Sequence, residues 1–102
     1  MNISAGEAKR VADSFCSSKL EFYKRKCIPI LEKLIKDESA VGGYQIRVDA
    51  MSYLEGEDYG AMHSRKLALR LKDELVLELV SNGFRCTGGL NFTPTDFCVT
   101  WE

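Results

Sequence analysis

Apolar residues near the start of the chain recur at the spacing of an amphipathic helix. Ser4 and Glu7 form an S-x-x-E capping box, which satisfies free N–H groups at a helix start, so we predict that a helix begins there. At about 100° per residue, one group of apolar side chains falls within an arc of about 120°. This first stripe consists of Ala8, Val11, Ala12, Phe15, Phe22 and Tyr23.

A second apolar stripe follows on a different side of the same helical stretch, with its centre rotated by about 130° from the first. It consists of Cys27, Ile30, Leu31, Leu34 and Ile35. A straight helix cannot bury both stripes against one surface. Pro29 lies at the change of phase, where proline removes a backbone hydrogen bond but is tolerated at the start of a new helix. We therefore predict a long helix, a kink or short break near residues 27–29, and a second helix that ends at about Glu38.

The centre of the chain predicts a strand followed by a further helix. Gly42 and Gly43 end the helical part, because glycine accepts the positive φ found just past a helix. Residues 44–49 then alternate between apolar and polar side chains, the period of a half-buried strand. After a loop at residues 50–60, residues 61–82 return to helical spacing. Their apolar side chains lie on two sides, so this helix needs two neighbours.

Residues 84–89 and 96–101 are predicted to form the two strands of a hairpin. If Cys86 lay opposite Cys98, the apolar side chains would be split between the two faces of the sheet. Because side chains alternate between faces, a shift by one residue gathers the apolar ones on one side. The gathered side chains are Phe84, Cys86, Phe97, Val99 and Trp101. We prefer this register, which makes Cys86 a buried small hydrophobe, sends Cys98 to the other face and argues against a disulfide between them.

The predicted order, α-α-β-α-β-β, indicates a single α+β domain over residues 1–102. The simplest architecture has two layers, with a long kinked N-terminal helix and a second helix packed on one face of a small three-stranded sheet. If the first two strands are parallel, the helix between them makes a right-handed crossover. The strand order stays open. Such a sheet leaves edges and one face uncovered, so we expect a homo-oligomer, formed through an edge or through the long first helix.

Composition excludes several classes of protein. The 102 residues include 14 Lys+Arg and 15 Asp+Glu, which leaves a net charge of -1. This balance argues against a nucleic-acid coat, an acidic DNA mimic and a basic membrane-surface protein. There is no apolar run of about 18 residues and no apolar segment typical of a secretory signal, so we expect a cytoplasmic protein without membrane contact. Its four cysteines should be reduced, and no C-x-x-C pair suggests a zinc ribbon or redox centre.

Residues able to perform chemistry are few. His63 is the single histidine, and a Cys/His hydrolase would require a contact between it and Cys16, Cys27 or Cys98; an exposed first-turn helix residue is the simpler interpretation. The acidic side chains of the central loop do not match a calcium-binding loop, so we interpret them as solvated and predict no metal and no cofactor. These side chains are Glu55, Glu57 and Asp58.

Two groups of residues are candidates for binding a partner or ligand. Lys24 and Arg25 belong to the densest basic segment, but its charges surround the helix instead of forming one stripe, so nucleic acid is disfavoured as the main ligand. In the second group, aromatic faces that stack on bases precede a helix start that attracts phosphate, which would suit a nucleotide. The second group consists of Tyr53, Tyr59, His63, Arg65 and Lys66. The simpler interpretation is that Tyr53 and Tyr59 cover the edge of the core.

Scattered segments of the chain resemble the layout of small phage-encoded accessory proteins. The resemblance rests on ISAGEAKRVA near the start, YQIRV after Gly43, LVSNGFRC, and the final DFCVTWE. It implies a small non-catalytic protein that acts on host machinery or on host defence components, including proteins that sequester nucleotide signals. No functional residue carries over from it. A phage-encoded protein of this kind would act in the host cytoplasm.

The leading hypothesis is therefore a non-enzymatic protein-binding module of the phage inhibitor type, which would occlude a host defence protein. The alternative is a small-molecule binder that sequesters a nucleotide or cyclic dinucleotide signal between subunits. A Cys/His hydrolase is the remaining hypothesis. The first rests mainly on what the chain lacks, namely a catalytic set, a cofactor motif and a strong charge bias.

Overall fold

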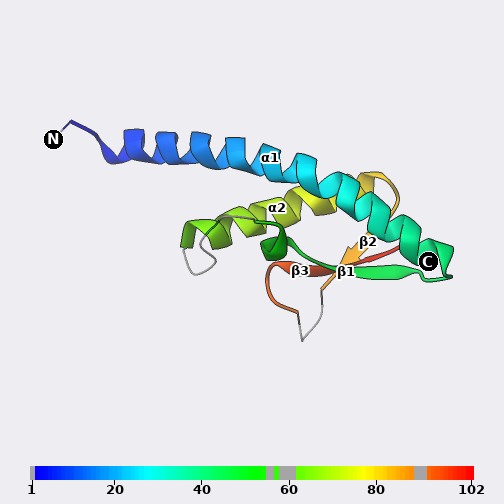
Figure 1. Cartoon of the computed structure of the whole chain (residues 1–102). Helices are drawn as coiled ribbons and strands as arrows, with labels where there is room; N and C mark the ends of the chain where they lie inside the picture. Colours follow the sequence, from blue (N-terminus) through cyan, green and yellow to red (C-terminus); the bar gives the residue numbers. More distant parts are fainter. Residues whose placement is uncertain (1, 55–56, 58–61, 89–91) are drawn as a thin grey trace.

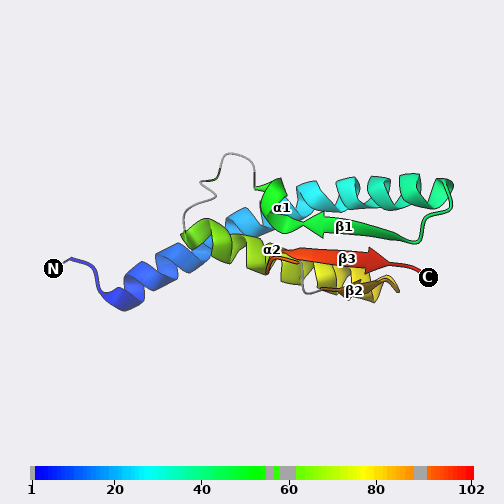
Figure 2. The same cartoon turned by 90° about the horizontal axis from the view of Figure 1, so that it is seen from below.

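Helices and sheet form two layers in the computed structural model, which describes residues 2–54, 57, 62–88 and 92–102. The elements are α1 (Ala5–Ala40), β1 (Gln45–Asp49), the 3-10 turn η1 (Ala50–Tyr53), α2 (Met62–Ser81), β2 (Arg85–Thr87) and β3 (Asp96–Thr100). Figures 1 and 2 show α1 and α2 on the same face of the sheet. The predicted α+β class and two-layer arrangement are confirmed.

Helix α1 begins as predicted but does not break. The Glu7 backbone N–H donates to Ser4 Oγ at 3.1 Å, which caps the first turn. The helix then runs without interruption through Pro29 to Ala40, so the two predicted helical segments are one element. Its ribbon changes direction gently in the blue-to-cyan middle part in both views (Figures 1 and 2). The predicted short break is therefore absent and the two predicted helical segments are continuous, whereas the predicted order of helical and extended segments holds.

The break is unnecessary because the chain does not bury both apolar stripes of α1. One side of the second stripe faces the core, where Cys27 and Leu31 are buried, whereas Ile30 and Leu34 of the same stripe are exposed. The first stripe contributes only Tyr23 to the core. Its larger members point to solvent, with exposures of 64% for Val11 and 62% for Phe15. The phase change in the pattern therefore marks two different surroundings along one helix.

The sheet has the order β1-β3-β2, and each neighbouring pair is antiparallel. Because β1 and β2 are both antiparallel to β3, they are parallel to each other, and α2 connects them across the central strand. The predicted hairpin of β2 and β3 is confirmed. So is its shifted register, since Cys86 pairs with Val99.

The core lies between the helices and the inner face of the sheet. Strand positions Val48, Phe97 and Val99 are buried there together with Leu71 and Leu75 of α2. All four cysteines are free thiols. Cys86 and Cys98 of the hairpin lie on opposite faces of the sheet. Cys86, expected to be buried, is half-buried against the core.

Helix α2 buries one of its two apolar stripes. Leu67 and Leu79 belong to the buried stripe, which packs against the rest of the core. On the other side, Met62 is 73% exposed and Val80 is 53% exposed. The two predicted neighbours of this helix are thus present within the chain, as α1 and the sheet, although part of its second stripe stays exposed. None of the helices in the described part of the chain is both long and apolar enough to cross a bilayer.

Candidate functional site

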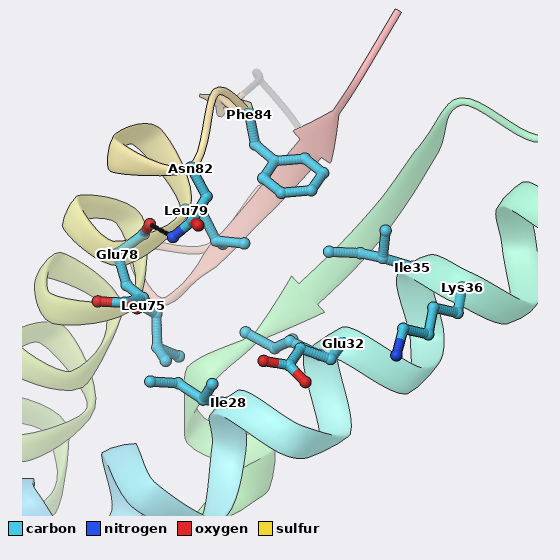
Figure 3. Close-up of a pocket in the computed structure, with 10 residues that line it drawn as sticks. Ile28, Glu32, Ile35, Lys36, Leu75, Glu78, Leu79, Asn82 and Phe84 are labelled. Carbon is cyan, nitrogen blue, oxygen red and sulfur yellow. Dashed lines mark hydrogen bonds between the residues drawn. The ribbon is translucent and has the colours of Figure 1, made fainter.

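A groove of about 250 Å³ opens between α1 and α2. Its walls come from the C-terminal half of α1 and the C-terminal half of α2, and a residue just before β2 closes one end. The apolar lining is Ile28, Leu31, Ile35, Leu75, Leu79 and Phe84. In Figure 3 the side chains of Ile28, Ile35, Leu75, Leu79 and Phe84 project into the space between the two helices.

Helical periodicity places the lining residues on facing surfaces. Ile28, Leu31 and Ile35 are spaced by three and four residues, so they share one face of α1. Of these three, Leu31 is buried, whereas the two isoleucines are half-buried. Phe84 is also half-buried, and its ring meets the ring of Trp101 edge to face at 6.2 Å between centroids. Buried Leu31 therefore forms the base of the groove, and the half-buried side chains of its walls remain accessible to a ligand.

The rim of the groove is charged. Glu32 and Lys36 lie along the α1 side, and Glu78 lies on the α2 side. Asn82 Nδ2 donates a hydrogen bond to the Glu78 backbone oxygen at 2.8 Å, which satisfies a free carbonyl near the end of α2 (Figure 3). Two carboxylates and one ammonium group thus surround an apolar hollow.

A second polar feature lies at the other end of α2, around the carboxylate of Glu57. Its side chain is only 8% exposed. It forms an ion pair with Lys19, and Tyr23 Oη donates a hydrogen bond to the same carboxylate oxygen at 3.1 Å. His63 Nε2 lies 4.0 Å from the other oxygen. The cluster therefore ties the middle of α1 to the start of α2.

The interpretation of Glu57 as a solvated loop carboxylate is wrong, because tertiary contacts cover and pair it. Its two predicted companions, Glu55 and Asp58, lie outside the described residues. The hydrogen bond from Lys19 lowers the pKa of Glu57, burial opposes this, and the hydrogen bond from Tyr23 lowers the pKa further. Among the described residues, no group of three or more potential metal ligands comes together.

We expect Glu57→Gln to lower the Tm at pH 7 by roughly 4–8 °C, because it removes charge-assisted hydrogen bonds. A carboxylate with a depressed pKa in the folded state stabilises the fold above its ordinary pKa, 4.5 for Glu57. This stabilisation is lost as the pH falls below that value. Thermal unfolding from pH 7 to pH 3 should therefore show the variant approaching the wild type in acid.

Glu21→Gln is the matched control for Glu57→Gln. Glu21 accepts a hydrogen bond from Arg25 Nε, one turn later on α1, at 3.2 Å, and the Glu21 side chain is 57% exposed. An exposed pair of this kind contributes little to stability, so the control should change the Tm by no more than about 2 °C. An equal effect of the two substitutions would contradict a special role for the Glu57 cluster.

The structure places the predicted nucleotide-binding residues in different surroundings. His63, Arg65 and Lys66 are exposed in the first turns of α2. Tyr53 lies in η1, half-buried and packed against the core, which agrees with a role in covering the core edge. Burial raises the pKa of its hydroxyl. Tyr59 lies outside the described residues.

The two predicted basic residues of α1 already have acidic neighbours. Lys24 Nζ lies 3.4 Å from Glu74 Oε2 on α2, and Arg25 Nε donates to Glu21 one turn earlier on α1. A phosphate group would have to compete with these carboxylates. The sequence could not reveal the contact with Glu74, which joins residues 50 positions apart.

The thiols of Cys27 and Cys86 are not activated. Burial raises the pKa of Cys27 to about 11, and the nearby Lys26 offsets this only in part. Burial also raises the pKa of Cys86. A nucleophilic cysteine needs the opposite shift, which keeps the thiolate populated at neutral pH.

Comparison with protein-family models, with curated proteins and with solved structures finds no match.

Proposed function

We propose that the protein is a non-enzymatic protein-binding module, which receives an apolar anchor side chain of its partner in the groove between α1 and α2. The groove volume of about 250 Å³ carries this proposal. Sites for drug-sized ligands usually span roughly 300–1,000 Å³, so this groove suits a side chain better than a whole nucleotide. Aromatic and aliphatic anchors that fill such pockets often supply most of the binding energy in protein interfaces.

The shape and charge of the groove favour an amphipathic helix as the bound segment. Two helices form its walls, and a third helix laid between them would bury its apolar face on Ile28, Ile35 and Phe84. Carboxylates outnumber ammonium groups on the rim, because Glu32 and Glu78 are matched only by Lys36. A partner helix with Lys or Arg beside its apolar anchor would complement this rim.

Such a module would act by covering a surface that its partner needs for another interaction. The resemblance of the sequence to phage-encoded accessory proteins suggests that the partner is a host protein, for example a component of host defence. This part of the proposal rests on the sequence layout, whereas the groove supports the mode of binding.

The other hypotheses have weaker support. Nucleotide capture near His63, Arg65 and Lys66 would place phosphate close to the carboxylate of Glu57, which repels it. A hydrolase would need His63 beside a reactive thiol. The charged group that lies 4.0 Å from His63 Nε2 is instead the carboxylate of Glu57.

The proposal is tested with a display library of amphipathic helical peptides about 20 residues long, selected for binding to the wild-type protein. We expect selected peptides to share an apolar anchor flanked by Lys or Arg. We expect Ile35→Glu to weaken their binding at least tenfold, because it places a carboxylate in the apolar wall. The measurement is the Kd of each selected peptide by fluorescence anisotropy.

The matched control is Ile30→Glu, the same substitution on the same helix. Ile30 is 42% exposed and lies outside the groove lining, so its substitution should change the Kd less than twofold. Circular dichroism checks that both variants fold. Peptides that bind wild type and Ile35→Glu equally, or that lack any apolar anchor, would refute groove binding.

A further inference from the structure

The first turns of α1 form an arm that the other described residues leave almost entirely uncovered. The arm is defined as residues 5–18. All of its side chains are exposed except that of Cys16, which is half-buried, and burial in the core begins only at Leu20. Figure 1 shows this blue part of α1 extending beyond α2 and the sheet. An isolated helix shorter than about 12–15 residues is marginal in water, so an arm of this length gains little stability by itself.

The arm continues one face of α1 that carries large apolar side chains into solvent. Val11 is 64% exposed, Phe15 is 62% exposed and Phe22, just beyond the arm, is 56% exposed. Together with Ala8 and Ala12 these residues form the arm stripe, which lies on a different side of α1 from the core-facing residues. The sequence thus has the pattern of a buried helix face that its own chain leaves uncovered.

The ammonium groups beside the arm stripe lie against its aromatic rings. Lys19 Nζ lies 5.3 Å from the centre of the Phe15 ring, and Lys26 Nζ lies 5.4 Å from the centre of the Phe22 ring. These ammonium groups leave the rings accessible, because both rings remain more than half exposed.

The chain exposes more accessible surface than a compact monomer of the same mass. The chain exposes 7010 Å², whereas a compact monomer of 11.5 kDa exposes about 5,800 Å². Its radius of gyration is 15.8 Å, against about 13 Å for a compact domain of this length. The excess area is about 1,200 Å², and each partner of a stable complex buries about 800 Å². The arm therefore offers enough surface for a specific interface.

We infer that the arm stripe is the interface with a second copy of this chain, paired as two antiparallel helices around a twofold axis. Charge selects this orientation. Residues 2–13 carry two acidic and two basic side chains, net zero, whereas residues 19–26 carry four basic and one acidic. Glu57 and Glu74 pair with Lys19 and Lys24, so this second segment keeps a net charge of +1 once these partners are counted. A parallel pair would bring two such positive segments together, whereas the antiparallel pair sets each of them beside the neutral segment and Glu7 of the other copy.

The apolar residues fit the same arrangement. Four members of the stripe, Ala8, Val11, Phe15 and Phe22, follow a heptad pattern in which Ser18 occupies the position between the two phenylalanines. Two paired helices require this spacing of three and four residues. In the antiparallel register centred between Cys16 and Ser17, Val11 packs against Phe22 of the second copy. Phe15 then meets the small side chain of Ser18 of the second copy. Each large side chain thus faces a smaller one, which lets the two helices approach closely.

This pairing is tested first by mass. Light scattering at about 100 µM should give twice 11.5 kDa for the wild type and 11.5 kDa for Phe15→Glu. The control, Ser17→Glu, places the same charge on the arm outside the stripe and should stay dimeric. A monomeric wild type would overturn the inference, and so would a Phe15→Glu variant that stays dimeric.

The orientation is tested by the largest dimension of the wild-type dimer in small-angle X-ray scattering. The chain alone measures 61 Å along its long axis. Antiparallel pairing puts the two sheet domains at opposite ends and should extend the particle to about 90 Å, at 1.5 Å per helical residue. A dimer no longer than about 65 Å would overturn the antiparallel arrangement. Because the groove lies outside the arm, Ile35→Glu should remain dimeric, so this inference and the proposed function can fail separately.

Discussion

Replacing Pro29 with alanine is expected to raise the free energy of unfolding by about 1–3 kcal/mol. Pro29 is exposed in the interior of α1, which continues to Ala40. Proline has no backbone N–H, so the carbonyl of Arg25 has no donor from the next turn, and the ring crowds that turn. Alanine restores the hydrogen bond. The gain is reduced by about 0.4–1 kcal/mol, because alanine also makes the unfolded chain more flexible.

Urea unfolding followed by circular dichroism measures this change, with Lys33→Ala as the control. Lys33 is exposed in the same helix and already donates its backbone N–H, so its substitution should stay within about 0.5 kcal/mol of wild type. If Pro29→Ala is neutral or destabilising, the bend that Pro29 allows contributes more to the packing of α1 than the missing hydrogen bond costs.

Local patterns in the sequence predict the boundaries and faces of most elements. The capping box fixes the start of α1 at Ser4, and the alternation of residues 44–49 predicts β1. The shared face of Phe97 and Val99 predicts the register of the hairpin. Each of these features is set by residues close in sequence or by the alternation of side chains along one strand. Both kinds of information can be read from a short stretch of sequence.

The failed prediction concerns what covers a face. Periodicity shows that Phe15 and Phe22 share one side of a helix, but it cannot show whether the same chain or another molecule covers them. Requiring burial within the chain led to the prediction of a kink or short break near residues 27–29, whereas the structure keeps one continuous helix and leaves the first stripe exposed. The change of phase in the apolar pattern is real, but it reflects different surroundings along one helix and not the end of that helix.

The candidate site was less predictable because it is assembled from distant segments. Ile35 is visible in the sequence as a helix-face residue, but its position across a groove from Leu79 and Phe84 depends on how α1 and α2 pack. The burial of Glu57 depends on Lys19, which is 38 positions away. No local pattern distinguishes such a carboxylate from a solvated one.

Phe97→Ala is expected to lower the free energy of unfolding by about 3–5 kcal/mol, because it removes a large side chain from the core and leaves a cavity. Phe97 is 1% exposed, lies on the central strand opposite Val48, and faces the helices. A domain of this size has about 5–15 kcal/mol of stability in total. The loss should therefore lower the Tm by more than about 12 °C, measurable by thermal unfolding.

Cys98→Ala provides the control one residue further along β3. Cys98 pairs with Arg47 and Thr87 on the outer face of the sheet, so its substitution should cost less than about 1 kcal/mol. Because adjacent strand residues point to opposite faces, the two variants compare the inner and outer faces of the sheet at neighbouring positions of β3. If Cys98→Ala proved the more harmful, the outer face of the sheet would be buried in solution. The arm could then not be the only surface that a second copy covers.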